Sequence, residues 1–474
     1  MQFMPDRRHA VNRVTQEMFP LLADHVRLQP LVDYVKVLNV RTGENRHLSR
    51  REAIPLEMAR GDRSLQEIVR TVGEVYSLSE SQAGSLVEAV FDLYRDEVEW
   101  SKVTTPIRTI SDPERLFSMD GRIRPPAPLR QDRPSQLKLS VTLACNYRCG
   151  HCCNRSGERM ARELTCEEWL QIIREAGKLE VLSVTFSGGE PLIRPDLPAL
   201  IAEASSVGIY SVLSTNASLI DRNIARELAC AGLRFAHVSL CAADADMYGR
   251  LTGSHNKFAA ALNGLRHLKG QDIYVRLKTV LMPGNLDQIG GVLDLAMNEG
   301  VDEVHLAPYR MTHLSPGGSS LLLRRNDFWQ IQAKVDQWKK QTNSNMPIRV
   351  PDPEKEKLAW DGAGEIVRCG GIKAEMTVLP DGRITLCEVL RDRPEFIVGH
   401  ALRDGILGAW LSRRPEEVLE DIVEKAEEPC GSCSHLSGCR TGCFALSLAC
   451  GGDPWSADPR CWKSSYPGNP FLGL

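Results

Sequence analysis

Cys145, Cys149 and Cys152 form a C-x3-C-x2-C motif that brings three thiols into eight consecutive residues. Thiolates at such short spacing can hold one metal centre, either zinc or an iron–sulfur cluster. Three protein ligands leave one of four coordination positions open for an outside ligand, whereas a structural zinc site is closed by four. The motif therefore favours a reactive centre, and a structural zinc loop completed by Cys153 or His151 is the alternative.

A second group of cysteines lies in the C-terminal part of the chain. It consists of Cys369, Cys387, Cys430, Cys433, Cys439, Cys443 and Cys461. Their spacing indicates metal binding, with a pair of zinc ribbons as the structural alternative to iron–sulfur clusters. The run 380–383, Pro-Asp-Gly-Arg, predicts a hairpin turn between strands at 375–378 and 384–386, which would bring Cys369 and Cys387 together. Lone cysteines are more often small buried hydrophobes, which we expect for Cys153, Cys166, Cys230 and Cys241.

The composition excludes several classes of protein. The 474 residues predict two to four domains, and 42% hydrophobic with 25% charged residues excludes a disordered or fibrous chain. The 58 basic and 61 acidic residues give a net charge of -3, so the overall charge does not favour binding to nucleic acid or to an anionic membrane. We see no apolar run long enough to span a membrane and no signal peptide, so we expect a cytoplasmic protein with reduced cysteines.

The central part of the chain alternates strands with amphipathic helices. Strands are predicted near 137–143, 181–186, 208–215, 234–240, 273–281 and 303–308, and helices beginning near Thr165, Asp196, Leu219, Phe258, Leu286 and Asn326. Six βα units predict an α/β fold, a partial (β/α)6 TIM-like barrel with its active site at the carboxyl ends of the strands. The first cysteine motif follows the first of these strands.

The N-terminal part has a different pattern. A β-hairpin is predicted over 32–48, and Ser49, Ser64 and Ser79 each begin a helix with a Glu or Gln three residues later, as in a capping box. A hairpin followed by three short helices is typical of a winged-helix-like α+β domain. DNA binding is the first interpretation of such a domain, but Glu88 and Asp92 on the last helix would repel phosphate, so we expect no nucleic-acid partner.

The proline-rich stretch 124–128 divides the chain. We expect a winged-helix-like domain over 1–104, a linker over 105–135, a barrel over 136–345 and a Cys-rich domain over 346–474.

The second predicted strand ends in Ser-Gly-Gly-Glu-Pro at 187–191, one βα unit after the cysteine motif. The two motifs together resemble the radical S-adenosylmethionine (radical SAM) enzymes. The resemblance implies that Cys145, Cys149 and Cys152 hold a 4Fe-4S cluster whose open iron is chelated by S-adenosyl-L-methionine. It also implies a set of cofactor-binding residues: His151 near the adenine, Gly188, Gly189 and Pro191 around the methionine, Glu190 on its ammonium, and Ser214, Asn216 and Ser239 as further polar contacts.

The C-terminal cysteine pattern, with Gly382 inside it, resembles the SPASM domain of radical SAM enzymes that act on peptides and proteins. That resemblance implies two auxiliary 4Fe-4S clusters, one held by Cys430, Cys433, Cys439 and Cys461, the other by Cys369, Cys387 and Cys443. An eighth cysteine of the pattern is missing between Cys241 and Cys369. The second of these clusters is therefore expected to have an open iron, occupied by a substrate side chain, or to take Cys450 or an oxygen donor instead.

The hairpin and three helices at 30–100 resemble the RiPP recognition element, a domain that binds the leader of a ribosomally made precursor peptide. In that family the leader adds as a strand to a sheet edge. The combined resemblance implies a precursor peptide as substrate and flavodoxin or ferredoxin as electron donor. It predicts hydrogen abstraction by a 5'-deoxyadenosyl radical and an intramolecular C–C, C–O or C–S cross-link. The alternatives are peptide epimerisation, a formylglycine-type protein maturase and a non-enzymatic zinc scaffold.

Overall fold

The computed structural model of the chain describes residues 18–22, 26–30, 34–39, 45–59, 63–76, 78–95, 98–101, 133–351, 375–412, 414–434, 436–439, 441–459 and 461. The chain divides into two compact units, residues 1–131 and 132–474. No helix among the described residues is both long and apolar enough to cross a membrane.

The first unit contains the predicted hairpin and helices, together with strands that the sequence did not reveal. Its three-stranded antiparallel sheet has the order β2 (Val26–Pro30), β3 (Tyr34–Asn39) and β4 (Asn45–Ser49). The helices are α1 (Arg50–Glu57), α2 (Leu65–Tyr76) and α3 (Glu80–Leu93). A separate pair joins β1 (Phe19–Leu22) to β5 (Val98–Ser101).

All three predicted capping boxes are formed. At the first, the Glu52 amide donates to Ser49 Oγ at 3.3 Å and the Ser49 amide donates to Glu52 Oε2 at 2.9 Å. Ser64 with Glu67 and Ser79 with Gln82 repeat this reciprocal pair. Each box satisfies amides that a helix start leaves without an intrahelical partner, which explains why the helices begin at these serines.

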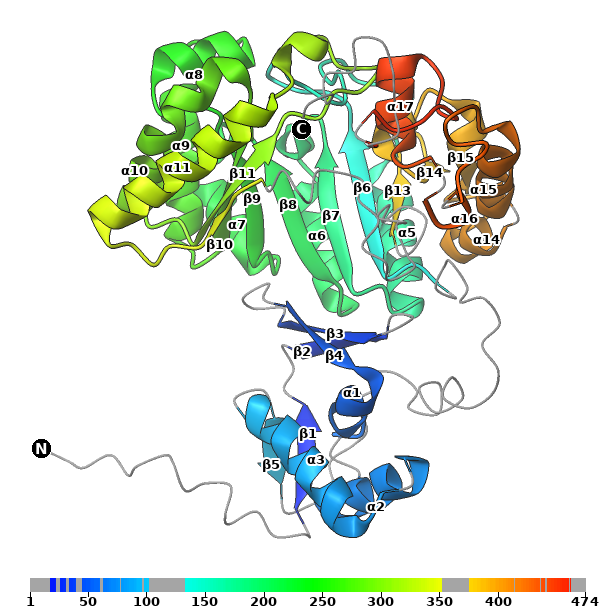
Figure 1. Cartoon of the computed structure of the whole chain (residues 1–474). Helices are drawn as coiled ribbons and strands as arrows, with labels where there is room; N and C mark the ends of the chain where they lie inside the picture. The colour runs from blue at the N-terminus through cyan, green and yellow to red at the C-terminus, as the bar shows by residue number, and fades with distance from the viewer. Residues whose placement is uncertain are drawn as a thin grey trace, which may run out of the picture. The chain divides into compact units, whose positions relative to one another are not determined.

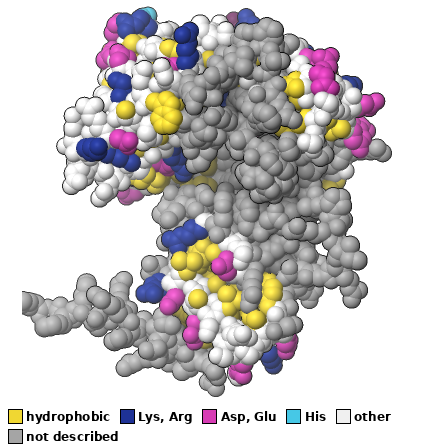
Figure 2. Space-filling view, viewed as in Figure 1, with side chains coloured by type: hydrophobic (Ala, Val, Ile, Leu, Met, Phe, Trp, Pro, Cys, Tyr) yellow, Lys and Arg dark blue, Asp and Glu magenta, His cyan; other side chains and the backbone are white. Residues whose placement is uncertain are grey.

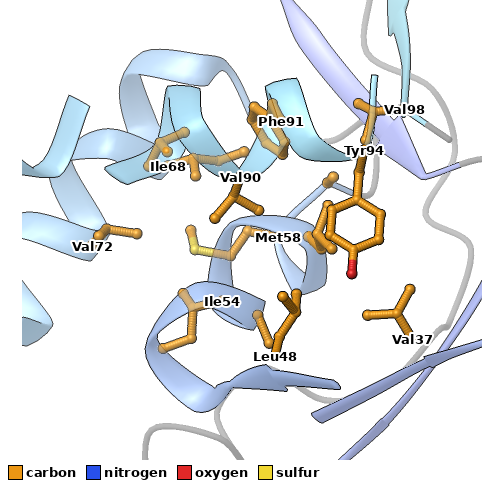
Figure 3. Packing of buried hydrophobic residues seen from close by; sticks show 14 of the residues in the cluster. Val37, Leu48, Ile54, Met58, Ile68, Val72, Val90, Phe91, Tyr94 and Val98 are labelled. Atoms are coloured by element: carbon orange, nitrogen blue, oxygen red, sulfur yellow. The ribbon is translucent and has the colours of Figure 1, made fainter. Parts of the chain in front are cut away.

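The three helices close over one hydrophobic core of their own (Figure 3). Ile54 from α1 and Met58, the residue that follows this helix, meet Ile68 from α2 and Val90 from α3, and all four side chains are nearly or completely inaccessible. Every member of this buried cluster belongs to the first unit. The face of the unit drawn in Figure 2 carries basic and acidic side chains interspersed rather than a basic patch.

The second unit is built on one ten-stranded sheet (Figure 1). Its central strands are parallel and follow the chain order: β6 (Gln136–Thr142), β7 (Ser183–Gly188), β8 (Tyr210–Thr215), β9 (Phe235–Ser239), β10 (Tyr274–Leu281) and β11 (Glu303–Pro308). All six predicted strands are therefore confirmed. β12 (Ile348–Arg349) extends the sheet in parallel beyond β11. The strand order leaves the sheet open, as expected for a partial barrel.

Helices cover the outer face of these parallel strands. They are α5 (Cys166–Lys178), α6 (Leu197–Ser206), α7 (Arg222–Cys230), α8 (Ala245–Thr252), α9 (Phe258–Lys269), α10 (Ile289–Asn298) and α11 (Arg325–Thr342), with 3-10 turns η3 (Pro191–Ile193), η4 (Pro283–Gln288) and η5 (Ser319–Leu321). Along β10, Val275 and Leu277 are fully buried on the side where α9 packs, whereas Arg276 and Lys278 alternate with them and lie on the opposite, inner face.

The Cys-rich part continues the same sheet. β13 (Glu375–Val378) pairs in parallel with β6, and β14 (Arg383–Thr385) and β15 (Ile397–His400) follow in antiparallel order. The turn between β13 and β14 contains Gly382 at a φ of 89°, a left-handed conformation that glycine adopts without strain. The remaining elements are η6 (Glu388–Leu390), η7 (Pro394–Phe396), α14 (Ile406–Leu411), α15 (Arg414–Lys425), α16 (Leu436–Cys439) and α17 (Phe444–Gly451).

Candidate active site and cluster-binding loops

The first cysteine motif begins directly after β6, and backbone hydrogen bonds fix its course. The Cys145 amide donates to the Gly157 carbonyl at 3.1 Å, and the Cys152 amide donates to the Cys149 carbonyl at 3.2 Å. The amides of Arg148 and Gly150 donate to the carbonyls of Thr252 and Leu251, at 3.0 and 3.2 Å. These last carbonyls end α8, a helix that the sequence analysis did not predict. The motif is thus held by the end of α8 as well as by hydrogen bonds within its own loop.

The three thiols of the motif lie in a half-buried loop close enough to influence one another. Burial raises the pKa of Cys145 to about 11, and the neighbouring Glu190 and Cys152 add to it. Burial and the thiols of Cys241, Cys152 and Cys145 raise the pKa of Cys149 as well. Arg148 in the same loop opposes the shift at Cys145 without cancelling it. Crowded thiols of this kind are the donor set that a metal centre would deprotonate and bind, so the residues fit an iron–sulfur cluster by their chemistry.

The described side chains are not closed around an ion: no three histidine, cysteine or carboxylate groups in the described part of the chain meet the geometry of a metal site. His151 belongs to the same loop, and burial lowers its pKa to about 4, so the imidazole is neutral at physiological pH. Its Nδ1 is buried without a hydrogen-bond partner among the described residues. An unpaired ring nitrogen beside the thiols is a polar group that a bound ligand would satisfy.

The Gly-Gly-Glu-Pro segment after β7 lies against the cysteine loop. The amides of Gly189 and Glu190 donate to the carbonyls of Thr142 and Ala144, at 2.7 and 2.9 Å. A β-carbon on Gly189 would lie only 2.1 Å from the Ala144 carbonyl oxygen, so a side chain is excluded there. Gly188 has a φ of 122°, which disfavours other residues as well. Both glycines are therefore required for the strand end to approach the loop this closely.

Glu190 connects this segment to the end of β8. Its side chain is 1% exposed and accepts from Thr215 Oγ1 at 2.8 Å, the Asn216 amide at 2.8 Å and the Leu192 amide at 3.2 Å. Burial raises its pKa to about 7 although all three hydrogen bonds oppose that shift. Since two carboxylate oxygens can accept about four hydrogen bonds, about one acceptor position remains for a donor such as an ammonium group.

Asn216 closes a second link back to the cysteine motif. Its Nδ2 donates to Asn146 Oδ1 at 2.8 Å, and its Oδ1 accepts from Ser218 Oγ at 2.7 Å. The Asn146 side chain in turn donates to Ser218 Oγ at 2.9 Å. Asn216 is thus more than a turn cap, because it bridges the strand end and the motif. Ser214 is half-buried near the end of β8, and Ser239 is exposed at the end of β9, within the same row of strand ends.

The C-terminal cysteines form a second group. Burial and the thiols of Cys461, Cys439 and Cys433 raise the pKa of Cys430 to about 12. The other three residues expected to hold the same auxiliary cluster as Cys430 therefore lie within electrostatic range of its thiol. Backbone hydrogen bonds shape this group: the Cys433 amide donates to the Cys430 carbonyl at 2.9 Å, and the Cys461 amide donates to the Asp458 carbonyl at 2.8 Å.

The cysteines expected for the other auxiliary cluster are less completely described. Cys369 lies outside the described residues, Cys387 precedes η6, and Cys443 precedes α17. Burial raises the pKa of Cys450 to about 11, with Asp458 and Cys443 contributing to the shift. Cys450 is therefore near Cys443. Ala449 and Cys450 also pack against a cluster that includes Met282 and Tyr309, the residues that directly follow β10 and β11, so α17 contacts the segments that leave these strands.

The isolated cysteines correct part of the sequence analysis. Cys241 is 5% exposed, as expected for a small buried hydrophobe, but Cys153 and Cys230 are exposed and Cys166 is half-buried. Cys153 directly follows the motif, and its thiol interacts electrostatically with Lys138 and Lys278 on the inner face of the barrel. A cysteine that is exposed yet close to two barrel lysines borders the space inside the sheet.

Sequence reasoning missed the charged residues of the inner face. Lys138 on β6 forms an ion pair with Glu388, and Arg276 Nε on β10 donates to Glu303 Oε2 at 2.6 Å. Lys278 follows on β10. The alternation of these residues with fully buried apolar ones was visible in the sequence, but strand periodicity alone does not reveal which face lines an active site.

Comparisons with known proteins agree with this architecture. The model of the radical SAM superfamily matches residues 139–296, which span the cysteine motif and the Gly-Gly-Glu-Pro segment. A PqqA peptide cyclase of Streptomyces rochei is 28% identical over 338 residues, covering 70% of this chain and 90% of that protein. SuiB of Streptococcus suis, solved with its precursor peptide SuiA, superposes with a TM-score of 0.68 at 18% identity, over 93% of this chain and 98% of that one. The structure of native anSMEcpe with bound AdoMet superposes with a TM-score of 0.52 at 16% identity, over 71% of this chain and 93% of that one.

The fold, the motif at the end of β6 and the family match define the class. The chain carries a radical SAM domain over residues 139–296 and is an enzyme. That domain implies a 4Fe-4S cluster and S-adenosylmethionine as cofactors. The expected partial (β/α)6 barrel is confirmed.

Proposed function

We propose that this enzyme modifies a ribosomally made precursor peptide and forms an intramolecular cross-link in it. The observation that carries the proposal is the hydrogen-bonded junction of the cysteine motif, the Gly-Gly-Glu-Pro segment and the end of β8, because it brings Glu190 and Asn216, two of the residues expected to bind S-adenosylmethionine, against the loop of the motif. Similarity to a PqqA peptide cyclase and to SuiB, which was solved with its precursor peptide, supports a peptide substrate.

Cys145, Cys149 and Cys152 would hold the 4Fe-4S cluster. With S-adenosylmethionine bound, that centre supplies a 5'-deoxyadenosyl radical able to take hydrogen from an unactivated carbon. The buried Glu190 would accept a hydrogen bond from the ammonium group of the methionine moiety. The backbone of Gly188, held close to β6, leaves room for that moiety beside the loop.

The first unit supports leader binding. The antiparallel sheet β2-β3-β4 has two outer strands, and in the described residues neither β2 nor β4 pairs with a strand other than β3. An outer strand presents backbone amides and carbonyls that an extended peptide can pair with. A leader bound there would tether the core peptide and raise its effective concentration at the barrel.

The C-terminal cysteines would hold two auxiliary 4Fe-4S clusters. Cys430, Cys433, Cys439 and Cys461 would supply all four thiols of one of them. For the other cluster, the closeness of Cys450 to Cys443 favours Cys450 as the fourth ligand, together with Cys369 and Cys387. An auxiliary cluster would accept the surplus electron when a cross-link forms, and a flavodoxin or ferredoxin would reduce the first cluster.

The test is the mass of short peptides encoded beside this chain after anaerobic co-expression, in ordinary and deuterated water. We expect the loss of two hydrogens per cross-link, absent with the Cys145→Ala variant. Unchanged mass with deuterium uptake would replace cross-linking by epimerisation. If no adjacent peptide changes at all, the proposed substrate class is wrong and a protein substrate takes its place.

A further inference from the structure

The inner face of the barrel carries Lys138, Arg276 and Lys278 with Glu303 and Glu375, and these strand residues interact electrostatically with Arg310, Arg349 and Glu388 from neighbouring segments. Lys278 interacts electrostatically with Lys138, although β7, β8 and β9 separate their strands in the sheet. Such reach across the sheet requires that the strands curl and that both side chains point into the enclosed space.

Most of these charges are already compensated. Glu303 accepts from Arg276 at 2.6 Å and also pairs with Arg349 from β12. Lys138 pairs with Glu388. The carboxylates of Glu303 and Glu388 are almost completely buried, so both are committed to the cations beside them.

Lys278 is the exception. Its side chain is half-buried and has no hydrogen bond or ion pair with any residue in the described ranges. Burial lowers its pKa, and the neighbouring cations Lys138, Arg310 and Arg276 contribute in the same direction. A half-buried ammonium group without an anion is costly, and an arriving carboxylate would both pair with it and supply the missing hydrogen-bond acceptor.

Lys278 lies beside the expected reaction centre, so an anion that pairs with it would lie there too. In the register of the sheet Lys278 lies opposite Ser239, one of the residues expected to contact S-adenosylmethionine. Its ammonium group is also within electrostatic range of Cys153, which follows the cysteine motif. The expected cofactor contacts come from the ends of β6 to β9, whereas Lys278 lies three residues before the end of β10. Lys278 therefore lies one strand beyond the strands whose ends carry the expected cofactor contacts.

We propose that Lys278 binds the side-chain carboxylate of an aspartate or glutamate in the peptide substrate and so selects an acidic residue next to the carbon that is attacked. The inference rests on the proposed function, because it names the chemistry of the peptide that the barrel accepts. His237 and His305, whose pKa values burial lowers to about 3 and about 4, lie on the same face as neutral hydrogen-bonding groups. They add no further positive charge at physiological pH.

The test compares two probes on the cluster-loaded enzyme with S-adenosylmethionine bound: N-acetyl-glutamate N-methylamide and its glutamine counterpart. We expect the wild type to bind the glutamate probe about tenfold more tightly, because one charge-assisted hydrogen bond is lost with the amide. Lys278→Met should abolish this preference, and Lys278→Arg should keep part of it. Lys339→Met, at an exposed lysine of α11, is the matched control and should behave as wild type. Iron content and thermal melting verify that each variant is folded and loaded.

Equal binding of both probes by the wild type, or an undiminished preference in Lys278→Met, would overturn the inference. A loss of S-adenosylmethionine affinity in Lys278→Met with the probe preference intact would also overturn it, because the lysine would then serve the cofactor carboxylate. The proposed function fails separately, when no precursor peptide changes mass on co-expression. Once a precursor is identified, replacing its acidic core residues one at a time by amides should abolish modification at one position.

Discussion

The ammonium group of Lys138, on the first barrel strand, forms an ion pair with the carboxylate of Glu388, which directly follows Cys387. Ser140 Oγ donates to the same carboxylate at 2.9 Å. Burial by itself would raise the pKa of Glu388, but Lys138 and these hydrogen bonds outweigh it and the pKa is lowered. The strand that leads to the first cysteine motif is thus fastened to the segment that carries a cysteine of the second group.

Breaking this pair should destabilise the second unit. Glu388→Gln leaves Lys138 without a counter-charge in a site where the carboxylate is 3% exposed, so we expect a loss of about 3 kcal/mol in the free energy of unfolding. Denaturant unfolding of the second unit is the measurement. The double variant Lys138→Met/Glu388→Leu should recover most of the loss, since neither charge is then buried alone. Equal losses in the single and double variants would show that the pair is not the cause.

The close approach at Gly189 predicts a sharp difference between two glycine substitutions. Gly189→Ala places a methyl group 2.1 Å from the Ala144 carbonyl, so the loop must move, and we expect S-adenosylmethionine binding to weaken at least tenfold. Gly290→Ala, in α10 with nothing within 4 Å, should leave binding unchanged and stabilise the helix by about 0.5–1 kcal/mol. Isothermal titration of the two loaded variants distinguishes them, and normal affinity in Gly189→Ala would contradict the proposed role of this segment.

The buried Glu190 predicts a pH-dependent stability. Its pKa of about 7 in the folded protein lies above the ordinary value of 4.5, so the folded state binds the extra proton between these values. Its contribution to stability is therefore complete below about pH 4.5 and is lost as the pH rises toward 7. We expect the melting temperature of the cofactor-free wild type to fall more steeply from pH 5 to pH 8 than the melting temperature of Glu190→Gln. Parallel profiles would mean that Glu190 is already ionised at pH 5.

The separate core of the first unit allows leader binding to be removed without touching the barrel. Ile68→Asp puts a charge into a fully buried position and should unfold that unit, so the full chain should lose affinity for the precursor leader. S-adenosylmethionine binding should persist. Leu93→Asp makes a similar change at a residue that is 54% exposed. It should preserve both leader binding and S-adenosylmethionine binding. Leader binding by Ile68→Asp at wild-type affinity would place the leader site elsewhere.

The proposed cluster ligands predict distinct iron contents. Three filled clusters require about twelve irons per chain, and Cys430→Ala should remove about four of them. Cys450→Ala should change the spectrum of the other auxiliary cluster if Cys450 is its fourth ligand, whereas the exposed Cys230→Ala should change neither quantity. Iron analysis and electron paramagnetic resonance of the reconstituted variants provide the readouts. An unchanged spectrum in Cys450→Ala would favour an oxygen donor or a substrate ligand.

The six barrel strands were predictable because short apolar runs alternate with amphipathic segments along the chain, and several helix starts because their capping residues are local. The helix α8 was missed: its eight residues are mixed in polarity and include a glycine. Pairings between distant segments, such as Lys138 with Glu388, leave no local signal in one sequence. The motif residues could be named from their spacing, but the burial of Glu190 and the bridge from Asn216 to Asn146 depend on how separate strand ends meet.

The parallel pairing of β13 with β6 has a consequence for the order of events during synthesis. Residues 136–139 hydrogen-bond to 375–378, which leave the ribosome only after the whole barrel has been made. Until then one edge of β6 stays unpaired, next to the loop with the first three cysteines. Pairings over such a separation in sequence form slowly. The nascent chain therefore passes through a stage in which the strand that leads to the first cysteine motif has an open edge, and only the C-terminal strands close it.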